Sequence, residues 1–365
     1  MSLILDGTSG ITNLTSINGG QLGGRRNIVI NGEMKVAQRS TSETGLGAGS
    51  AYATLDRWRT AVDAASAGRF TMAQIADGPA GFANCMKLSC TTADTSIAAG
   101  EVLQIVTRFE GQDVQQLQKG TATAKQVTVS FYVKGNASAT YTCELIDYDN
   151  GRSIQQAFAV TTAWNRIELT FAADTSDPFD DDNAGSLGLA FWLHGGSTYT
   201  GGTFSSNAWK DTVDNTRLSD SQTSIFDATS RTFFLTGVQM ELGATATEFE
   251  HRSYAEELYL CQRYFQLIGS NFYGMVEGTN TFNMQVPYWR PMRAAATVAG
   301  ISGGKFSARY EGDHTTTDPT TANISTTSEG VWLQVAGTSL TDKTTIYGRC
   351  QNHPTSNFLS ATAEL

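Results

Sequence analysis

Short runs of alternating apolar and polar residues constrain this fold more than any other feature. Apolar side chains take every second position in three clear runs, formed by Val127, Val129, Phe131 and Val133; by Ile167, Leu169 and Phe171; and by Leu187, Leu189, Phe191 and Leu193. A period of two predicts strands that bury one face and solvate the other. Because many such strands are short and separated by Gly, Asp, Asn and Ser, we expect a mainly β protein built on an antiparallel jelly-roll sandwich.

Two turn signals predict hairpins within this sandwich. Residues 141–146 and 154–160 flank Asp147-Tyr-Asp-Asn-Gly151, and Asn-Gly is the strongest short hairpin signal. Asn27-Ile-Val-Ile-Asn-Gly-Glu-Met-Lys-Val-Ala-Gln-Arg39 is expected to form a strand, an Asn31-Gly32 turn and a second strand. The strand at residues 234–242 is expected to close the domain.

The composition agrees with sheets rather than helices. The chain has 365 residues, enough for two domains, and only 16% of them are charged. Its polarity therefore comes from hydroxyl and amide groups, which suit solvated strand faces better than helices rich in Glu and Lys.

One helix is expected, over residues 253–268. Ser253 and Glu256 have the spacing of a capping box. An apolar stripe follows at steps of four and three, formed by Tyr254, Leu258, Cys261, Phe265 and Ile268. The stripe is interpreted as an oligomerising junction, and the alternative is a surface helix packed on its own domain.

A smaller C-terminal β-sandwich domain is expected after this helix, at residues 269–365. Alternation returns in residues 282–286 and 331–335, a last strand is expected at 358–365, and a polar loop at 311–329. The segment could instead extend the first domain. The predicted organisation is therefore a segment 1–26, a jelly-roll domain 27–252, the helix 253–268 and the domain 269–365.

The N-terminal segment, residues 1–26, contains six glycines and isolated aliphatic residues, which cannot form a core. It is either a disordered tail or a segment that becomes ordered on another protein. We favour the second interpretation, because the aliphatic residues recur between turn signals.

Charge excludes several partners. The net charge is -10 and the basic residues are scattered, so no patch exists to bind nucleic acid or an anionic membrane surface. The sequence shows neither a signal peptide nor an apolar run of membrane-spanning length. We expect a soluble protein that is synthesised in the cytoplasm and does not insert into a membrane.

Catalytic and metal-binding patterns are sparse. The five cysteines are widely spaced and are expected to be free thiols rather than zinc ligands or disulfides. No hydrolase or nucleotide-binding motif is present, and His251 is interpreted as a capping or packing residue. We expect that the protein is not an enzyme. A polysaccharide-degrading enzyme needs only two carboxylates, and among 35 acidic residues such pairs arise by chance, so the sequence singles out no pair.

One acidic cluster, Asp177-Pro-Phe-Asp-Asp-Asp-Asn183, is a candidate calcium site. Its possible carboxylate ligands are Asp177, Asp180, Asp181 and Asp182. The run lacks the spacing of a known calcium loop, so a solvated turn is favoured and no cofactor or metal is expected.

Sugar recognition needs flat aromatic rings beside amide and hydroxyl groups. Trp192, Tyr199 and Trp209 lie in stretches of that composition. Trp192 points away from the core row of its strand, so it is either a stacking platform or buried against another loop or a neighbouring subunit. Tyr288, Trp289 and Trp332 are rival candidates in the last domain.

Several motifs together resemble a family of tailed-bacteriophage tail fibre and adhesin proteins. They are Met1-Ser-Leu-Ile-Leu-Asp-Gly-Thr-Ser-Gly10, Asn27 to Arg39 as quoted above, Leu55-Asp-Arg-Trp58, Arg108-Phe-Glu-Gly-Gln-Asp113, Thr236-Gly-Val-Gln-Met-Glu-Leu-Gly243, Phe249-Glu-His-Arg252 and Glu257-Leu-Tyr-Leu-Cys-Gln-Arg-Tyr264. The middle domain is similar to galactose-binding-like jelly rolls, the architecture of many carbohydrate-binding modules. The resemblance covers residues 27–268 and is loose beyond them.

The resemblance implies a homotrimeric, elongated component of the virion tail. It implies that residues 1–26 dock to another virion protein and that the distal part attaches to the host surface, by binding a polysaccharide or lipopolysaccharide. Two alternatives stay open: a purely structural virion part, such as a head decoration protein or fibre adaptor, and a polysaccharide depolymerase.

Overall fold

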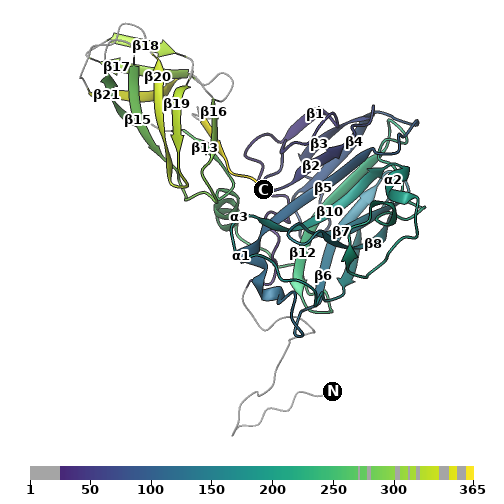
Figure 1. Ribbon diagram of the computed structural model, residues 1–365. Helices are drawn as coiled ribbons and strands as arrows, with labels where there is room; N and C mark the ends of the chain where they lie inside the picture. Colours follow the sequence, from purple (N-terminus) through teal and green to yellow (C-terminus); the bar gives the residue numbers. More distant parts are fainter. Residues whose placement is uncertain are drawn as a thin grey trace. The chain divides into compact units, whose positions relative to one another are not determined.

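The computed structural model describes residues 25–269, 272–277, 281–300, 305–310, 313–317, 321–336, 345–351 and 359–365 (Figure 1). The chain divides into two compact units, Met1–Arg252 and Ser253–Leu365. The predicted docking segment, apart from Arg25 and Arg26, lies outside the described residues.

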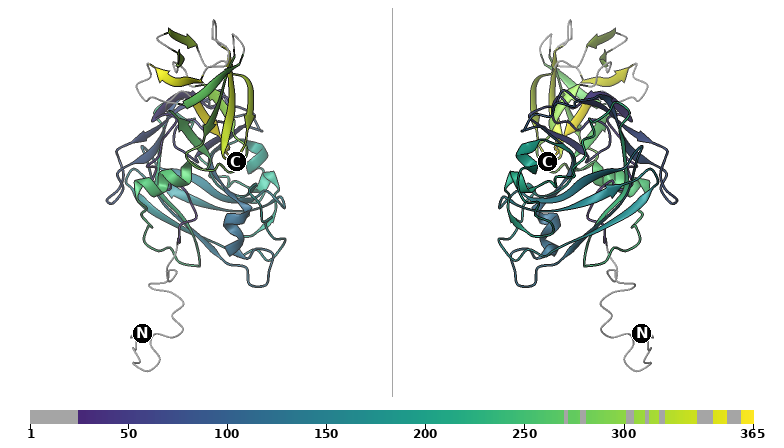
Figure 2. Two further views of the ribbon diagram at one scale, coloured as in Figure 1. Left: turned by 90° about the vertical axis from the view of Figure 1, so that its left-hand side faces the viewer. Right: turned by 90° about the vertical axis from the view of Figure 1, so that its right-hand side faces the viewer.

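The first unit is a sandwich of two antiparallel sheets, with six strands in each (Figures 1 and 2). The first sheet has the order β1 (Ser42–Leu46), β3 (Arg69–Ile75), β4 (Cys85–Thr92), β12 (Thr232–Leu242), β6 (Val127–Gly135) and β9 (Asn165–Phe171). The second sheet has the order β11 (Lys210–Asp211), β8 (Arg152–Val160), β7 (Ala139–Asp147), β10 (Gly185–Gly195), β5 (Val102–Glu110) and β2 (Arg59–Asp63). The antiparallel β-sandwich expected from the alternation is therefore confirmed.

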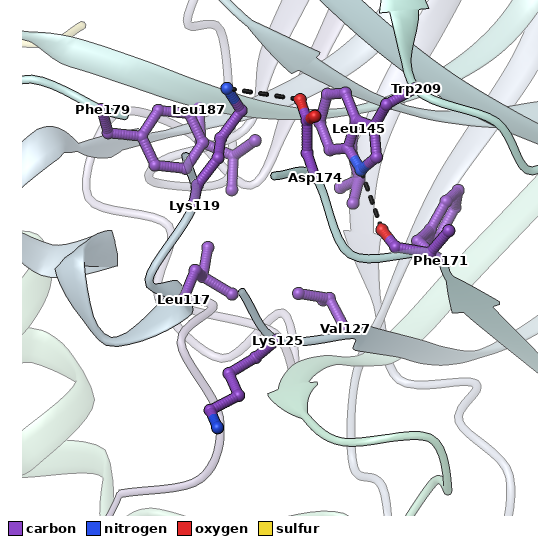
Figure 3. Close-up of a pocket in the computed structure, with 11 residues that line it drawn as sticks. Leu117, Lys119, Lys125, Val127, Leu145, Phe171, Asp174, Phe179, Leu187 and Trp209 are labelled. Atoms are coloured by element: carbon purple, nitrogen blue, oxygen red, sulfur yellow. Dashed lines mark hydrogen bonds and ion pairs between the residues drawn. The ribbon is translucent and has the colours of Figure 1, made fainter. Parts of the chain in front are cut away.

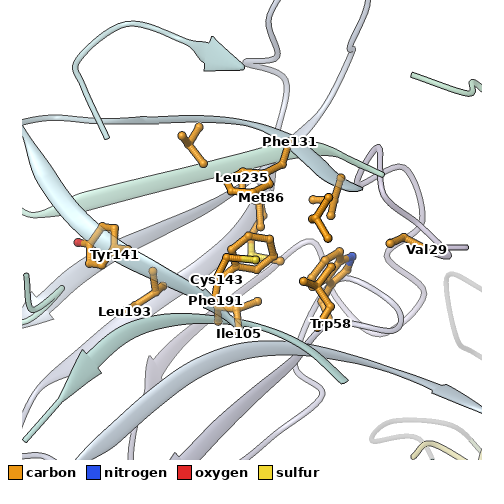
Figure 4. Close-up of a cluster of buried hydrophobic side chains, with 14 of the residues drawn as sticks. Val29, Trp58, Met86, Ile105, Phe131, Tyr141, Cys143, Phe191, Leu193 and Leu235 are labelled. Atoms are coloured by element: carbon orange, nitrogen blue, oxygen red, sulfur yellow. The ribbon is translucent and has the colours of Figure 1, made fainter. Parts of the chain in front are cut away.

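The core between the sheets contains the apolar rows that the alternation predicted (Figure 4). Phe131 of β6 and Phe191 of β10 meet edge to face, with ring centroids 4.9 Å apart. Trp58 packs beside Phe191, and its indole N–H donates to the carbonyl of Asn31. Burial of the inward row of β10 leaves its alternate residues on the outer face of the second sheet.

The hairpin predicted at Asp147–Gly151 joins β7 to β8. Asp147 accepts hydrogen bonds from the backbone N–H groups of Asp149 and Asn150, and Gly151 has φ 64°. The hairpin predicted at Asn27–Arg39 is wrong, because no strand forms there. The side chain of Asn31 bonds the backbone of Val36 and Asp56 instead, so the polar groups of this segment are satisfied without a ladder.

Helical turns in the first unit are short. They are α1 (Gly111–Val114), η1 (Gln115–Leu117), α2 (Ser197–Thr200) and η2 (Asp214–Thr216). α1 and η1 follow β5, and α2 follows β10. Each occupies a connection between strands rather than a layer of its own.

The second unit begins with α3 (Tyr254–Cys261), whose predicted cap is present: Ser253 accepts a hydrogen bond from the backbone N–H of Glu256. The predicted helix length is wrong, because residues 265–268 form strand β13 (Phe265–Ile268). Pairing of β13 with β22 (Leu359–Thr362) overrides the helical periodicity.

The stripe predicted for oligomerisation is therefore not one helical face. Cys261, Phe265 and Ile268 are buried, with Ile268 in the core of the second unit. Leu258 is half-buried and Tyr254 is exposed. Oligomerisation through these residues stays a prediction.

The rest of the second unit is β. One sheet has the order β13, β22 and β16 (Thr297–Gly300). The other has the order β18 (Asp313–Thr317), β17 (Lys305–Tyr310), β21 (Thr345–Gln351), β14 (Phe272–Glu277), β15 (Thr281–Pro287), β20 (Gly330–Ala336) and β19 (Thr321–Thr326). The loop predicted at 311–329 is wrong where β18 and β19 form, since β-branched threonines fit a ladder.

The cysteines that the structure describes form no disulfide. Cys85, Cys90, Cys143 and Cys261 are all buried. Burial raises the pKa of the Cys85 thiol to about 12 and that of Cys143 well above its ordinary value. These groups are protonated packing residues rather than nucleophiles. The side chain of Cys350 lies outside the described residues.

Candidate functional site

The outer face of the second sheet is covered on one half only. Residues 201–223, here called the cover segment, first pair along the edge of β8 through β11 and then cross the outer face of β8 and β7. There the side-chain amide of Gln155 donates to the carbonyl of Thr216, and Gln222 accepts a hydrogen bond from the hydroxyl of Thr142. The other half, formed by β10, β5 and β2, has no such layer in the described part of the first unit. Because the cover segment ends partway across the sheet, its edge forms one wall of a groove over the uncovered strands.

The groove has a volume of about 270 Å³, close to the lower end of the range of small-ligand sites. Its floor is lined by Ala61, Val106 and Ile146, which pack in one apolar cluster with the buried Ala190 of β10. The remaining lining residues are Arg59, Asp63, Val102, Gln104, Arg108, Tyr148, Trp192, Tyr199, Thr212 and Arg217. We call this set the sheet groove.

One end of the sheet groove is a stacked pair, Tyr148 and Arg108. The guanidinium carbon of Arg108 lies 4.3 Å from the centre of the Tyr148 ring, within cation–π range. The ring lies against the backbone of Gly188, where an added Cβ would come within 2.8 Å of it. Gly188 therefore lets the tyrosine lie on the sheet while 36% of Tyr148 stays exposed.

The other end is a buried cluster around Trp192. Its ring lies 5.2 Å from that of Tyr199, its N–H donates to Glu144 over 2.6 Å, and Arg217 covers its face at 4.7 Å. Arg217 also binds Glu144 through two hydrogen bonds of 2.8 Å each. The Glu144 side chain is fully buried, so this ion pair fixes the cover segment to β7.

Three polar side chains along the sheet groove lack hydrogen-bond or ion-pair partners among the described residues. Gln104 is only 8% exposed, and its amide makes no hydrogen bond to any described residue. The guanidinium groups of Arg59 and Arg108 make no ion pair within the described ranges, and Nε of Arg108 is buried without a hydrogen bond. Buried polar groups are normally paired, so these side chains have capacity for a ligand.

The structure brings together two of the three residues that the sequence nominated for sugar binding. Trp192 and Tyr199 meet at one end of the sheet groove, but they are only 1% and 7% exposed. Burial under the cover segment, the alternative reading of the sequence, describes Trp192 correctly. The exposed ring in the groove is Tyr148, which sequence reasoning missed because it lies in the hairpin turn.

Trp209 lies elsewhere, beside a small cavity of about 20 Å³ (Figure 3). Its N–H donates to the carbonyl of Ala172 over 2.8 Å. The ammonium of Lys119, between Asp147 (2.7 Å) and Asp174 (3.3 Å), lies 5.9 Å from the Trp209 ring. This volume suits about one water, so it is not a sugar site.

The rival aromatic residues are in the second unit. Trp289 and Trp332 are 55% and 51% exposed, whereas Tyr288 is buried.

The acidic cluster is solvated. Asp177, Asp180, Asp181 and Asp182 are all exposed. Asp182 accepts a hydrogen bond from the backbone N–H of Ala184, as in a polar turn. Within the described ranges no group of three or more His, Cys, Asp or Glu side chains is placed to hold a metal ion.

Two histidines in the first unit have structural contacts. His251 pairs with Glu33 and packs against Phe82. His194 lies between Ser224 (2.7 Å) and Glu101 (3.0 Å), the order of a nucleophile, base and acid. Its ring is fully buried and lines no part of the sheet groove. Burial lowers its pKa below the ordinary 6.5, against the opposing effects of Glu101 and Asp94.

None of the helices in the described part of the chain has the length and apolarity needed to cross a bilayer.

No protein-family model and no curated protein sequence matches the chain. Among solved structures it is similar to a family 11 carbohydrate-binding module from Clostridium thermocellum in complex with a β-1,3-1,4-mixed-linked tetrasaccharide, at 11% identity over 57% of this chain and 99% of that one, with a TM-score of 0.29. It is also similar to TmCBM61 in complex with β-1,4-galactotriose, at 9% identity over 60% of this chain and 99% of that one, with a TM-score of 0.30. A third is the CBM22-1 xylan-binding domain of Paenibacillus barcinonensis Xyn10C, at 12% identity over 57% and 99%, with a TM-score of 0.27. Because these TM-scores lie below 0.5, the sandwich is assigned from its own strand order, and the neighbours' ligands say nothing about this chain.

Proposed function

We propose that the first unit is a glycan-binding module and that the sheet groove holds the sugar chain. The observation that carries this proposal is the partly exposed Tyr148 ring, which packs over the backbone of Gly188 at one end of the groove, while the unpaired amide of Gln104 lies nearer the other end. A pyranose ring has an apolar C–H face and a rim of hydroxyls. The first packs on an aromatic ring, and the second hydrogen-bonds to planar polar side chains.

The groove is open rather than enclosed by the sandwich. Its floor residues Val106 and Ile146 come from β5 and β7, the two strands that flank β10, and lie on the outer face of the sheet. Gly188 and Trp192 are four residue steps apart along β10, a span of about 13 Å at the rise of a strand. The site therefore has room for a short stretch of a longer polysaccharide.

The setting that we propose is a phage adhesin, a tail fibre part that attaches the virion to a host-surface polysaccharide or lipopolysaccharide. The motif resemblance in residues 27–268 supports this setting. A homotrimer and docking through residues 1–26 belong to the same proposal. Two measurements test these parts independently of the sugar. The proteins of purified virions, separated by mass, should include this chain, and sedimentation of the free chain should give the mass of a trimer.

The binding proposal is tested with a glycan array, followed by calorimetric titration of the full chain with the tightest oligosaccharide. Tyr148→Ala should abolish measurable binding or weaken it about tenfold or more, since stacking and buried area are both lost. Tyr259→Ala is the matched control, because Tyr259 is another exposed tyrosine stacked on an arginine, Arg290, in the second unit. Equal binding by both variants would place the sugar outside the sheet groove.

A further inference from the structure

The charge of the sheet groove is opposite to that of the chain. The sequence has 25 basic and 35 acidic residues. The groove is lined by three arginines and one aspartate, Asp63, which is exposed at the end of β2. The glutamate behind it, Glu144, is buried and paired to Arg217. A basic groove on an acidic protein indicates a ligand that carries negative charge.

The two remaining arginines are neighbours and have no counter-ion. Arg59 pairs across β2 and β5 with Val106, and Arg108 is two residues further along β5 on the same face. Diagonal neighbours of this kind lie about 7–8 Å apart, so the guanidinium groups repel each other. Neither forms an ion pair with a described residue, although 35 acidic residues are present in the chain. An anion placed between them would relieve this repulsion.

Guanidinium chemistry narrows the ligand further. Each group presents a planar fork of N–H donors that matches a carboxylate or an ester sulfate in two parallel hydrogen bonds. Arg108 is oriented by stacking on Tyr148, the ring on which the sugar is proposed to pack. The guanidinium lies over the ring, so a sugar that packs on the exposed part of Tyr148 brings an acidic substituent beside it.

Resting on the proposed function, we infer that the sheet groove selects acidic polysaccharides, with Arg59 and Arg108 binding the carboxylate of a uronic-acid residue. Gln104 then hydrogen-bonds a hydroxyl of the neighbouring sugar. An ester sulfate also presents a negative charge and two acceptor oxygens to a guanidinium group. The probes below therefore distinguish carboxylated from sulfated sugars.

The test compares probes that differ only in charge. Oligogalacturonate, oligomannuronate and hyaluronan fragments are titrated beside their carboxyl-reduced, neutral counterparts and beside sulfated neutral oligosaccharides. We expect at least about tenfold tighter binding to a uronate than to its reduced form, and weakening of the uronate complex as NaCl increases.

Variants assign the effect to the groove. Arg59→Gln, Arg108→Gln and the double variant should each lower affinity for the uronate by a larger factor than affinity for the reduced form. Lys87→Gln is the control, because it removes one positive charge from β4 of the opposite sheet. Thermal melting checks that each variant is folded, and Arg59→Gln alone decides the question if the Arg108 variant unfolds.

The outcomes separate the two proposals. Tighter binding to uronates that is lost in the arginine variants supports the inference, and a preference for sulfated over carboxylated probes would replace the uronate by a sulfate ester. Equal or tighter binding to neutral chains, unchanged in the variants, overturns the inference and leaves a glycan-binding module. Binding to no neutral or acidic glycan contradicts the proposed function itself.

Discussion

Removal of the Arg217 guanidinium tests how the wall of the sheet groove is held. Arg217→Met keeps much of the side-chain volume over Trp192 but deletes the two 2.8 Å hydrogen bonds to Glu144. The Glu144 side chain has no solvent exposure, and its one other hydrogen bond comes from the Trp192 N–H. The substitution therefore leaves a buried carboxylate with one neutral donor.

The magnitude follows from this burial. Breaking a buried pair by removing one partner costs about 3–5 kcal/mol. For a unit of this size, each kcal/mol lowers the melting temperature by about 2–4 °C, so we expect a decrease of roughly 6–20 °C. The double variant Glu144→Leu/Arg217→Met should regain most of the loss, because no charge then stays buried alone.

Calorimetric melting of the full chain measures the effect. Arg166→Met is the control, since Arg166 pairs with Glu168, whose side chain is 49% exposed. Its expected cost is about 1 kcal/mol. A loss below 1 kcal/mol for Arg217→Met would refute the reasoning, because it would show that Glu144 reaches water or is protonated at little cost.

Three further predictions concern other sites in the first unit. Lys119→Met should lower the unfolding free energy by about 3–5 kcal/mol in urea melts, because two buried aspartates lose their shared ammonium, and a loss below 1 kcal/mol would contradict this. Because the pKa of His194 is depressed, its contribution to stability is complete above pH 6.5 and is lost as the pH falls through the folded pKa. Melting temperatures should therefore fall from pH 7 to pH 5 less steeply in His194→Gln than in the native chain, and equal slopes would contradict the assignment. Gly188→Ala should displace the exposed Tyr148 ring and weaken glycan binding about twofold to tenfold, with melting shifted by less than about 2 °C; unchanged binding would argue against the stacked ring as the sugar platform.

The fold was predictable where burial sets a simple period. The inward row of β10 reads directly from alternate apolar residues, because each lies in one core. Residues 27–39 were not predictable in the same way, since their backbone is satisfied by the Asn31 side chain rather than by a partner strand. The end of α3 also depends on a distant strand, β22, whose pairing no local pattern reveals.

The site was predictable only in part. The outward direction of Trp192 follows from its strand, but its burial depends on the cover segment, which carries no periodic signal. Arg59 and Arg108 could have been placed on the outer face by alternation, yet their adjacency requires the pairing of β2 with β5. One motif that carries the family resemblance has a structural role, because Arg252 donates to the carbonyls of Val29 and Asn27.

The crystal structure of the full chain with its tightest oligosaccharide tests the central claim most directly. The account predicts sugar density over Val106 and Ile146, with one ring packed on Tyr148 and an acidic group between Arg59 and Arg108. Density on the exposed Trp289 or Trp332 of the second unit, with the sheet groove empty, would contradict it.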